Sequence, residues 1–263
     1  MLPTLFVSHG APLAAIDGEP AQAAWAQIAG ALPRPAAVLI MSPHWPTATP
    51  AVASPPRHRT LHDFGGMPPA LYALDYPAPG DPRLASAVCA RLRDAGFDAS
   101  VSTRQDLDHG AWVPLRTMYP GADVPVVQLS VQPRLGPAHH YALGRSLAGL
   151  RGEGVLVVGS GALTHNLREV RLDSRVATVP GWARAFAAWM ATVLTAGDLA
   201  QLIDYRRLAP DAARNHPTEE HLLPLYFALG AAGEAPVARR AFEGFSYGPL
   251  AMDVWTFGEA AAH

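Results

Sequence analysis

Three of the 11 histidines, His9, His44 and His165, each come shortly after an apolar run of the kind that forms buried β-strands. These runs, each expected to be a strand, are Thr4–Val7, Ala37–Met41 and Val155–Val158. Ligands of open parallel sheets bind in the crevice beyond the carboxyl ends of the strands, so we expect the three imidazoles to converge there. Imidazole binds Fe(II), zinc, copper and nickel. The pattern therefore predicts a metal site without choosing the metal.

A fourth histidine, His221, lies in a segment with the features of a helix N-terminus. Pro217 suits the first helical position, where the missing N–H would have had no partner. His216 or Asn215 is then expected as the N-cap rather than as a metal ligand. The prediction places His221 one turn into this helix and pointing inward, with Glu219 in the first turn facing solvent.

The rest of the sequence alternates short β-forming runs with longer helical patterns, which is typical of an α/β protein. The further elements expected are a strand at Val124–Leu129 and helices at Gln22–Ala29, Pro82–Ala95, His139–Leu150, Trp182–Leu194 and Thr218–Leu229. Near-continuous apolar strands predict a mostly parallel central sheet with helices on both faces. Gly30 and Gly230 would fall just past two helix ends. Since no linker or repeat divides the chain, residues 1–263 are predicted to form a single domain.

Two segments depart from this alternation. Proline and glycine cluster in Pro43–Pro82, which predicts a long irregular loop. Loops of that length in a compact domain usually carry function. The tail near Phe242–Phe257 has β-forming character and is expected to add an edge to the sheet.

Composition excludes several classes of protein. Hydrophobic residues make up 49% of the chain, which allows a large core and excludes disorder. The net charge of −2 gives no reason to expect nucleic acid or an anionic membrane as partner. Cys89 is the only cysteine, so no intrachain disulfide or thiolate-rich metal site is expected, and its thiol is predicted to be buried and inert. No apolar run reaches the ~18 residues of a membrane span. A strand-like run beginning almost at Met1 leaves no room for a signal peptide, so a cytoplasmic location is expected.

The remaining histidines are expected to have structural or surface roles. A lone buried histidine usually bonds a backbone group, and an exposed one is solvated. The residues interpreted in this way are His58, His62, His139, His140 and His263.

Seven short motifs, in order along almost the whole chain, resemble those of the class III extradiol ring-cleavage dioxygenases, specifically the smaller DOPA-dioxygenase-type branch. The motifs are Ser8-His9-Gly10-Ala11-Pro12, Ser42-Pro43-His44-Trp45, His62-Asp63-Phe64-Gly65-Gly66-Met67-Pro68, Tyr76-Pro77-Ala78-Pro79-Gly80, Asp108-His109-Gly110-Ala111-Trp112, Thr164-His165-Asn166-Leu167 and Glu220-His221-Leu222-Leu223-Pro224-Leu225. Each motif is weak alone, and the specificity lies in their combination.

The resemblance implies a single catalytic domain with a three-layer α/β fold and a mononuclear metal. Carried over by motif, His9, His44 and His221 are similar to the metal ligands. His165 is similar to the acid/base residue, and it could become a fourth ligand when substrate is absent, especially with zinc. His109 is similar to a residue that positions substrate or oxygen.

The third ligand is open to a second interpretation. Larger relatives in this class use a carboxylate at that place, and Glu219 and Glu220 lie next to His221. We favour His221, because it occupies the position that matches this branch.

The expected chemistry is ring opening of a small aromatic diol by O2, with Fe(II) required for activity and Zn(II) able to occupy the site in purified protein. Three neutral imidazoles leave the charge of Fe(II) uncompensated, which favours an anionic catecholate. His165 is expected to take a proton, because its reference pKa of ~6.5 suits exchange at neutral pH. DOPA and other small catechols all fit this description.

A loop and three aromatic residues are further candidates for the pocket. Asp63, Phe64 and Gly65 are predicted to form part of its wall, where Phe64 could pack on an aromatic ring. Trp45 and Trp112 each lie close to a key histidine in the sequence, so pocket lining and core packing are both open. Tyr247 is a weaker candidate.

Two other functions are consistent with the same residues. A zinc-dependent hydrolase would use the three histidines and one water, with Glu219 or Glu220 as general base. A protein that binds a metal or a small molecule without chemistry would keep the ligands and lack a working His165 or His109. Both of the latter residues are present, which favours an enzyme.

Overall fold

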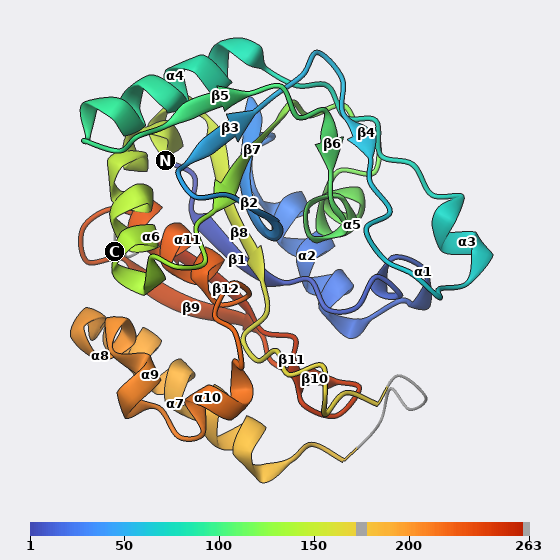
Figure 1. The fold of residues 1–263 in the computed structure, drawn as a ribbon, viewed down its shortest axis with the longest axis vertical. Coiled ribbons are helices and arrows are strands. Elements are labelled where there is room, and N and C mark those ends of the chain that lie inside the picture. Colours follow the sequence, from blue (N-terminus) through green and yellow to red (C-terminus); the bar gives the residue numbers. More distant parts are fainter. Residues whose placement is uncertain (172–177, 260–263) are drawn as a thin grey trace.

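An eight-stranded sheet runs through the middle of the computed structural model, which describes residues 1–171 and 178–259 (Figure 1). The strand order is β5-β3-β7-β2-β8-β1-β12-β9. The four central strands are parallel, whereas β12 and β9 form an antiparallel edge and β3 is antiparallel to β7. The strands of this sheet are β1 Thr4–Ser8, β2 Ala37–Pro46, β3 Ala51–Ala53, β5 Ser100–Ser102, β7 Val126–Val131, β8 Val155–Gly161, β9 Val237–Phe242 and β12 Val254–Gly258.

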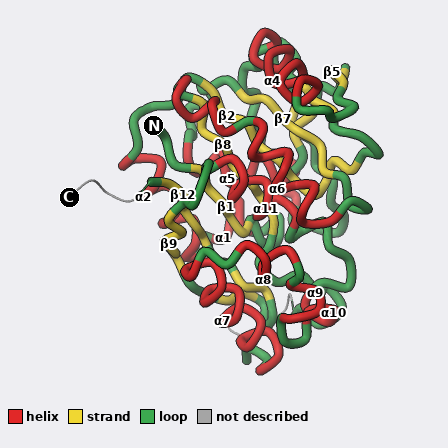
Figure 2. The backbone as a smooth tube through the Cα atoms, turned by 90° about the vertical axis from the view of Figure 1, so that its left-hand side faces the viewer, coloured by secondary structure: helices red, strands yellow, loops and turns green. Residues whose placement is uncertain are grey.

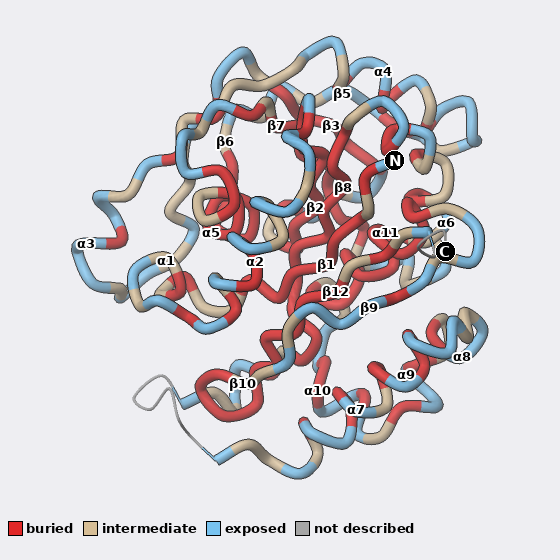
Figure 3. The backbone as a smooth tube through the Cα atoms, turned by 180° about the vertical axis from the view of Figure 1, so that it is seen from behind, coloured by how far each residue is buried: buried red, intermediate tan, exposed pale blue. Residues whose placement is uncertain are grey.

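Both faces of the central strands are buried, as Figure 3 shows for β1, β2 and β8. Because successive side chains of a strand point to opposite faces, β2 contributes to two separate cores. Val38 and Ile40 belong to one hydrophobic cluster, and Leu39 and Met41 belong to another. Polar alternation is therefore missing from these strands, which explains their continuous apolar sequence.

Helices cover both faces of the sheet, which gives three layers (Figure 2). On one face, Trp25 of α2 and Trp112 of α5 share a cluster with Val38. On the other face, α4, α6 and α11 pack in the cluster that contains Leu39. The longer helices are α2 Pro20–Ala31, α4 Pro82–Asp94, α5 His109–Met118, α6 Gly136–Ser146, α7 Gly181–Ala196 and α11 Leu223–Ala231. The predicted α/β class, with a mostly parallel sheet between helical layers, is confirmed.

Short elements complete the connections. They are helices α1 Ala14–Asp17, α3 Pro69–Tyr72, α8 Leu199–Ile203, α9 Tyr205–Leu208 and α10 Ala212–Asn215, the 3-10 helix η1 Ala148–Glu153, and strands β4 Arg59–Thr60, β6 Asp106–Leu107, β10 Phe245–Ser246 and β11 Leu250–Ala251. The segment Pro43–Pro82 is therefore less irregular than predicted, since it holds the end of β2, β3, β4 and α3. The tail forms the predicted sheet edge through β9 and β12. None of the helices within the described ranges is long and apolar enough to cross a membrane.

Two glycines that were expected just past helix ends lie inside the helices instead. Gly30 and Gly230 lie inside α2 and α11, each one residue before the helix ends. Helix α5 was not expected, because Gly110 and Pro114 interrupt its pattern. It forms because the carboxylate of Asp108 accepts a hydrogen bond from the backbone N–H of Ala111 and so caps its first turn.

Candidate active site

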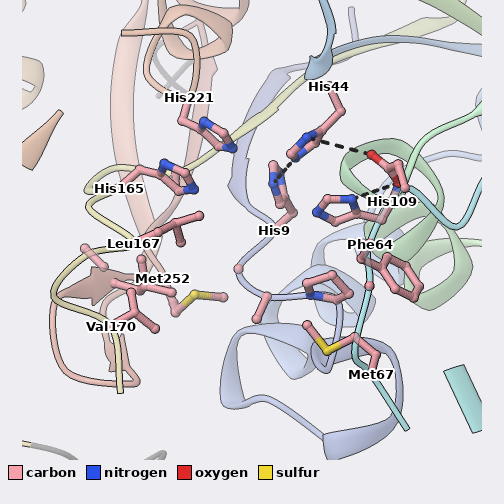
Figure 4. A pocket seen from close by; sticks show the side chains of 18 residues that line it. His9, His44, Phe64, Met67, His109, His165, Leu167, Val170, His221 and Met252 are labelled. Carbon is pink, nitrogen blue, oxygen red and sulfur yellow. Dashed lines mark hydrogen bonds and ion pairs between the residues drawn. The ribbon is translucent and has the colours of Figure 1, made fainter. Parts of the chain in front are cut away.

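Five histidines surround one cavity at the carboxyl ends of the parallel strands (Figure 4). His9 follows β1 directly, His44 lies near the end of β2, and His165 follows β8 by a short turn. His109 is the first residue of α5, and His221 comes from the segment before α11. The structure thus brings together all five histidines to which the sequence analysis gave a role at the site.

The helix expected from residue 218 begins only at Leu223, so His221 does not lie one turn inside it. Asn215 is the last residue of α10 and His216 is its C-cap, so neither caps α11, whose N-cap is Leu222. The carbonyl oxygen of His221 accepts a hydrogen bond of 2.9 Å from the backbone N–H of Ala162, at the end of β8. Gly161 permits this approach, because a Cβ there would collide with the His221 carbonyl. A tertiary hydrogen bond to β8, rather than helix propensity, therefore positions His221.

The hydroxyl of Ser160 fixes the tautomer of His9. Nδ1 of His9 lies 3.0 Å from Ser160 Oγ, and that hydroxyl donates its single proton to the carbonyl of Gly110. Since the proton is already used, His9 must donate from Nδ1, which leaves a lone pair on Nε2. Gly110 allows this contact, because a Cβ there would meet Ser42 Oγ and the rings of His44 and His9.

A carboxylate orients His221 in the same way. Nδ1 of His221 lies 3.2 Å from Oε1 of Glu220, and a carboxylate only accepts, so the ring donates from Nδ1. Its Nε2 is buried and has no hydrogen-bond partner within the described part of the chain. The ring of His165 stacks on that of His221, with centroids 3.4 Å apart.

Asp63 connects two other histidines of the site. Its Oδ1 accepts hydrogen bonds of 2.9 Å from the backbone N–H of His109 and 3.0 Å from Nδ1 of the same residue. Its Oδ2 lies 3.8 Å from Nδ1 of His44, which is an electrostatic contact rather than a hydrogen bond. The Nδ1 edges of both rings thus face the same carboxylate.

A buried polar network under the site holds β2, β7 and α5 together. The fully buried carboxylate of Asp108 accepts hydrogen bonds of 2.6 Å from Ser42 Oγ and 2.6 Å from Gln128 Nε2. Ser42 lies two residues before His44 and accepts a weak bond from its backbone N–H. Asp108 also caps the helix that begins at His109. One carboxylate therefore ties the backbone of His44 to the helix of His109.

The donor set fits a metal ion. Nε2 of His9 and Nε2 of His44 are 3.3 Å apart. Two imidazole nitrogens bound to one tetrahedral ion at roughly 2.1 Å are separated by about 3.4 Å. Ligand atoms of His9, His44 and His221 all lie within 4.8 Å of one another. The Nε2 of His221, which no described residue bonds, adds a third imidazole nitrogen to this group.

Two further groups of residues have metal-ligand spacing and share a histidine with the first. They are His44 with Asp63 and His109, and His165 with Glu220 and His221. In both groups the carboxylate accepts the Nδ1–H of a histidine, so it orients that ring. The all-histidine group has no such competing hydrogen bond among its ligand nitrogens apart from the His9–His44 contact.

Burial keeps these imidazoles neutral. It lowers the pKa of His9 and of His221 well below the ordinary value, and the neighbouring histidines lower them further. Burial, followed by the charge of His109, lowers the pKa of His44 to about 4. Burial, followed by His216, lowers the pKa of His165 to about 3, well below the value expected from the isolated side chain. Neutral rings at pH 7 are the form that binds metals.

The cavity has a volume of about 380 Å³ and one polar side. The predicted wall residues Asp63, Phe64 and Gly65 all line it. Several other lining side chains had no predicted role, although Met67 and Leu167 each fall in one of the motifs. The remaining large apolar ones are Met67, Leu167, Val170, Leu250 and Met252.

The other aromatic candidates do not line the cavity. Trp112 is fully buried in the core, and its Nε1 donates to the carbonyl of Leu61. Trp45 lies under the guanidinium of Arg104. The hydroxyl of Tyr247 bonds the carboxylate of Asp17. Core packing is thus the role of both tryptophans.

Glu219 had been expected to face solvent from the first turn of a helix. It lies before α11, and its side chain is only partly exposed. Its carboxylate accepts a hydrogen bond of 2.7 Å from the hydroxyl of Tyr205. The side chain is therefore turned toward the α9 region, and Glu219 does not line the cavity.

The histidines expected to be structural bond backbone or side-chain groups away from the cavity. Their ring nitrogens contact Val126 O for His58, Leu74 O for His62, Gln132 Oε1 for His139, and Gly136 O and Gln132 N for His140. His216, also not expected to be a ligand, donates from Nε2 to the carbonyl of Leu163. Cys89 is buried, as expected. His263 lies outside the described residues.

The fold and the site together are those of an α/β enzyme with a potential metal site. The histidine cluster and the cavity adjoin each other at the carboxyl edge of the sheet. The model of the family described as the catalytic LigB subunit of aromatic ring-opening dioxygenase matches residues 3–250. The chain belongs to this family, which confirms the resemblance seen in the motifs.

Individual relatives align with nearly the whole length of this chain. The 4,5-DOPA dioxygenase extradiol of Beta vulgaris is 44% identical over 237 residues, which is 88% of this chain and 87% of that protein. The protein of the same name from Escherichia coli (strain K12) is 38% identical over 256 residues, 95% of this chain and 93% of that one. The crystal structure of an uncharacterized protein from Escherichia coli K12 superposes with a TM-score of 0.83 at 33% identity, covering 98% of this chain and 100% of that chain. The protein is an extradiol ring-cleavage dioxygenase.

Proposed function

We propose that this dioxygenase opens the ring of a small catechol with O2 at a single Fe(II) ion, and that His9, His44 and His221 hold that ion through Nε2. The observation that carries the proposal is the convergence of three neutral imidazoles, two of them with Nε2 atoms 3.3 Å apart, at the edge of a cavity. Because these relatives are named as DOPA dioxygenases, DOPA is included among the proposed substrates, together with other small catechols.

Fe(II), when bound there, would supply Lewis acidity toward a catechol hydroxyl and the redox chemistry with O2. Three neutral ligands do not compensate the charge of the ion, so they favour an anionic substrate. The ligand histidines owe their orientation to Ser160 and Glu220, whose contacts turn Nδ1 of His9 and His221 away from the ion. Zn(II) would fit the same nitrogens without the redox chemistry.

His165 is the proposed proton acceptor. Its ring lies against that of His221, at the edge of the cavity. Since burial lowers its pKa to about 3, the imidazole is neutral before substrate binds and has a lone pair to accept with. A catecholate placed beside it would raise that pKa, because an adjacent negative charge favours the protonated ring.

His109 is proposed to position a substrate hydroxyl or O2. Its Nδ1–H is used by Asp63, which leaves Nε2 as an acceptor on a ring that lines the cavity. Phe64 lies beside His109, with ring centroids 5.9 Å apart, and offers an aromatic face to the substrate ring. Asp63 and Gly65 complete this side of the wall.

The comparisons do not favour the zinc-dependent hydrolase, because the family and the relatives are dioxygenases. The hydrogen bonds also argue against its general base. The carboxylate of Glu219 is bonded to Tyr205, and that of Glu220 accepts from His221 and Thr218.

The test is O2 uptake by protein loaded anaerobically with Fe(II), measured with DOPA and a small panel of catechols. Zn(II)-loaded protein is the control. We expect stoichiometric O2 consumption and a new yellow chromophore with iron only. Absence of uptake with every catechol, while iron is bound, would overturn the proposal.

A further inference from the structure

The cavity has two chemically different sides. The five histidines gather on one side, and the opposite side is apolar (Figure 4). Asp63 belongs to the histidine side, because its carboxylate contacts His109 and His44. Leu167, Val170 and Met252 lie on the His165 side of that apolar surface, and Met67 lies with Phe64 on the His109 side. If the two catechol oxygens face the histidines, the ring substituent must face these side chains.

The apolar surface continues to the mouth of the cavity. Leu167 lines the cavity, yet its side chain is 65% exposed, which places a large apolar group in water at the entrance. Methionine side chains adapt their shape and make favourable sulfur–aromatic contacts, so Met67 and Met252 suit a variable hydrophobic substituent. Contact with such a substituent would remove Leu167 from water.

Charged partners for a substituent are scarce. Among the residues that the structure describes, no arginine or lysine lines the cavity, and Asp63 is its only carboxylate. Both oxygens of Asp63 face imidazoles, at 3.0 Å from His109 Nδ1 and 3.8 Å from His44 Nδ1. Arg168 and Arg171, in the same loop as Leu167, are exposed and do not line the cavity.

We propose that this enzyme selects catechols with a neutral, apolar ring substituent over catechols with an ammonium or carboxylate tail, DOPA included. The inference rests on the proposed function, because the histidines must hold the catechol oxygens for the tail to face the apolar side. A charged tail against this apolar surface would lose part of its hydration without gaining a charged partner among the described lining residues, which costs binding free energy. A neutral ethyl group has no such cost.

The experiment separates binding from turnover. Dissociation constants of ethylcatechol, dihydroxyphenylpropionate, dopamine and DOPA, all substituted at the same ring position, are measured by calorimetry with Zn(II)-loaded protein. We expect ethylcatechol to bind about tenfold or more tightly than each charged compound. Equal or tighter binding of any charged compound would overturn the inference.

O2 uptake by the Fe(II)-loaded enzyme with the same four compounds then tests the proposed function on its own. Lack of uptake with a catechol that binds would overturn ring opening, while the ranking of affinities still decides the inference. If none of the four binds, both are overturned.

A pair of variants tests the apolar side directly. Leu167→Arg places a cation at the mouth, and we expect the preference for dihydroxyphenylpropionate relative to ethylcatechol to rise about tenfold. Leu135→Arg is the matched control, since Leu135 is also an exposed leucine (49%) and does not line this cavity. An unchanged ratio in Leu167→Arg, or an equal rise in both variants, would contradict the assignment.

Discussion

Two sets of buried histidines in this protein look alike by burial and differ in where their nitrogens point. His140 and His216 are fully buried in the core, and His9 and His221 are only 3% and 6% exposed at the site. Burial lowers the pKa in all four. The difference lies in the partners, because the core histidines bond backbone groups whereas the site histidines turn Nε2 toward other imidazoles or toward no partner.

His216 makes the distinction sharper. Its Nδ1 is buried without a hydrogen-bond partner among the described residues, as is Nε2 of His221. However, His216 belongs to none of the groups with metal-ligand spacing found among the described residues. An unpartnered nitrogen therefore points to a ligand only where further donors converge on the same place, and burial or a depressed pKa alone does not identify the site.

The largest expected effect is loss of the metal when a histidine of the site, rather than one of the core, is replaced. Replacing His9, His44 or His221 with alanine removes one of three donors, so we expect metal content and turnover to fall to background. His140→Gln is the control from the core set and should retain a full equivalent. Metal content is measured by mass spectrometry after anaerobic loading and desalting. A His44→Ala protein that still holds a full equivalent would exclude this ligand set.

The next effect concerns proton transfer. His165→Ala should fold and keep at least part of its metal, but lose about 10²–10⁴-fold in kcat, the usual contribution of a positioned acid or base. His139→Ala is the matched control, because its half-buried ring bonds Gln132 away from the cavity. Turnover of His165→Ala at the wild-type rate would refute the role.

The free energy of unfolding should depend on pH through the core histidine His140. Its Nδ1 lies 2.7 Å from the carbonyl of Gly136, and its Nε2 accepts from the backbone N–H of Gln132. Burial lowers its pKa to about 4, whereas the unfolded value is ~6.5. The lowered pKa gives a contribution to stability that is present above pH 6.5 and is lost as the pH falls through the folded value. The loss amounts to about 3 kcal/mol between pH 8 and pH 4.

The measurement is the free energy of unfolding in urea across that pH range. His140→Gln should be less stable than wild type at pH 8 and should lose about 3 kcal/mol less on acidification. Parallel curves for the two proteins would show that His140 does not titrate on unfolding.

Much of this arrangement could be predicted from local sequence. His9, His44 and His165 follow apolar runs, and the strand ends fix where such residues lie in a parallel sheet. His221 was predicted from its motif and from an expected helix start, and the helix start is wrong. Pro217 suggested a helix start, but the bond from Ala162 N–H to the His221 carbonyl holds the segment outside α11. That bond joins residues far apart in the sequence, and propensity does not contain it.

The hydrogen-bond partners of the site histidines were harder to predict from the sequence. Ser160 stands in a Gly-Ser-Gly run that was assigned no role, because its function depends on the Gly110 carbonyl from α5. Asp63 was predicted as part of the pocket wall and does line the cavity, but the contacts of its carboxylate with two imidazoles were not predicted. Such contacts depend on which elements pack together, so a pattern within one segment does not reveal them.

The smallest expected effect tests what orients a ligand rather than the ligand itself. Ser160→Ala removes the acceptor of the His9 Nδ1–H, so the ring can change tautomer and place a proton on Nε2, where the metal should bind. We expect the affinity for Zn(II) to fall about 10–100-fold, the usual effect of losing such a partner.

Competition titration with a chelator gives this affinity, and the ¹⁵N shifts of the His9 ring report its tautomer in the metal-free protein. Ser130→Ala is the matched control, because Ser130 is also fully buried and hydrogen-bonded, to Thr47 and Ala51 rather than to a histidine of the site. An equal loss in both variants would mean that general loosening of the sheet, and not the His9 tautomer, governs metal affinity. A loss confined to Ser160→Ala, with a proton shifted to Nε2, would show that the site histidines differ from those of the core through the groups that hold their Nδ1 edges.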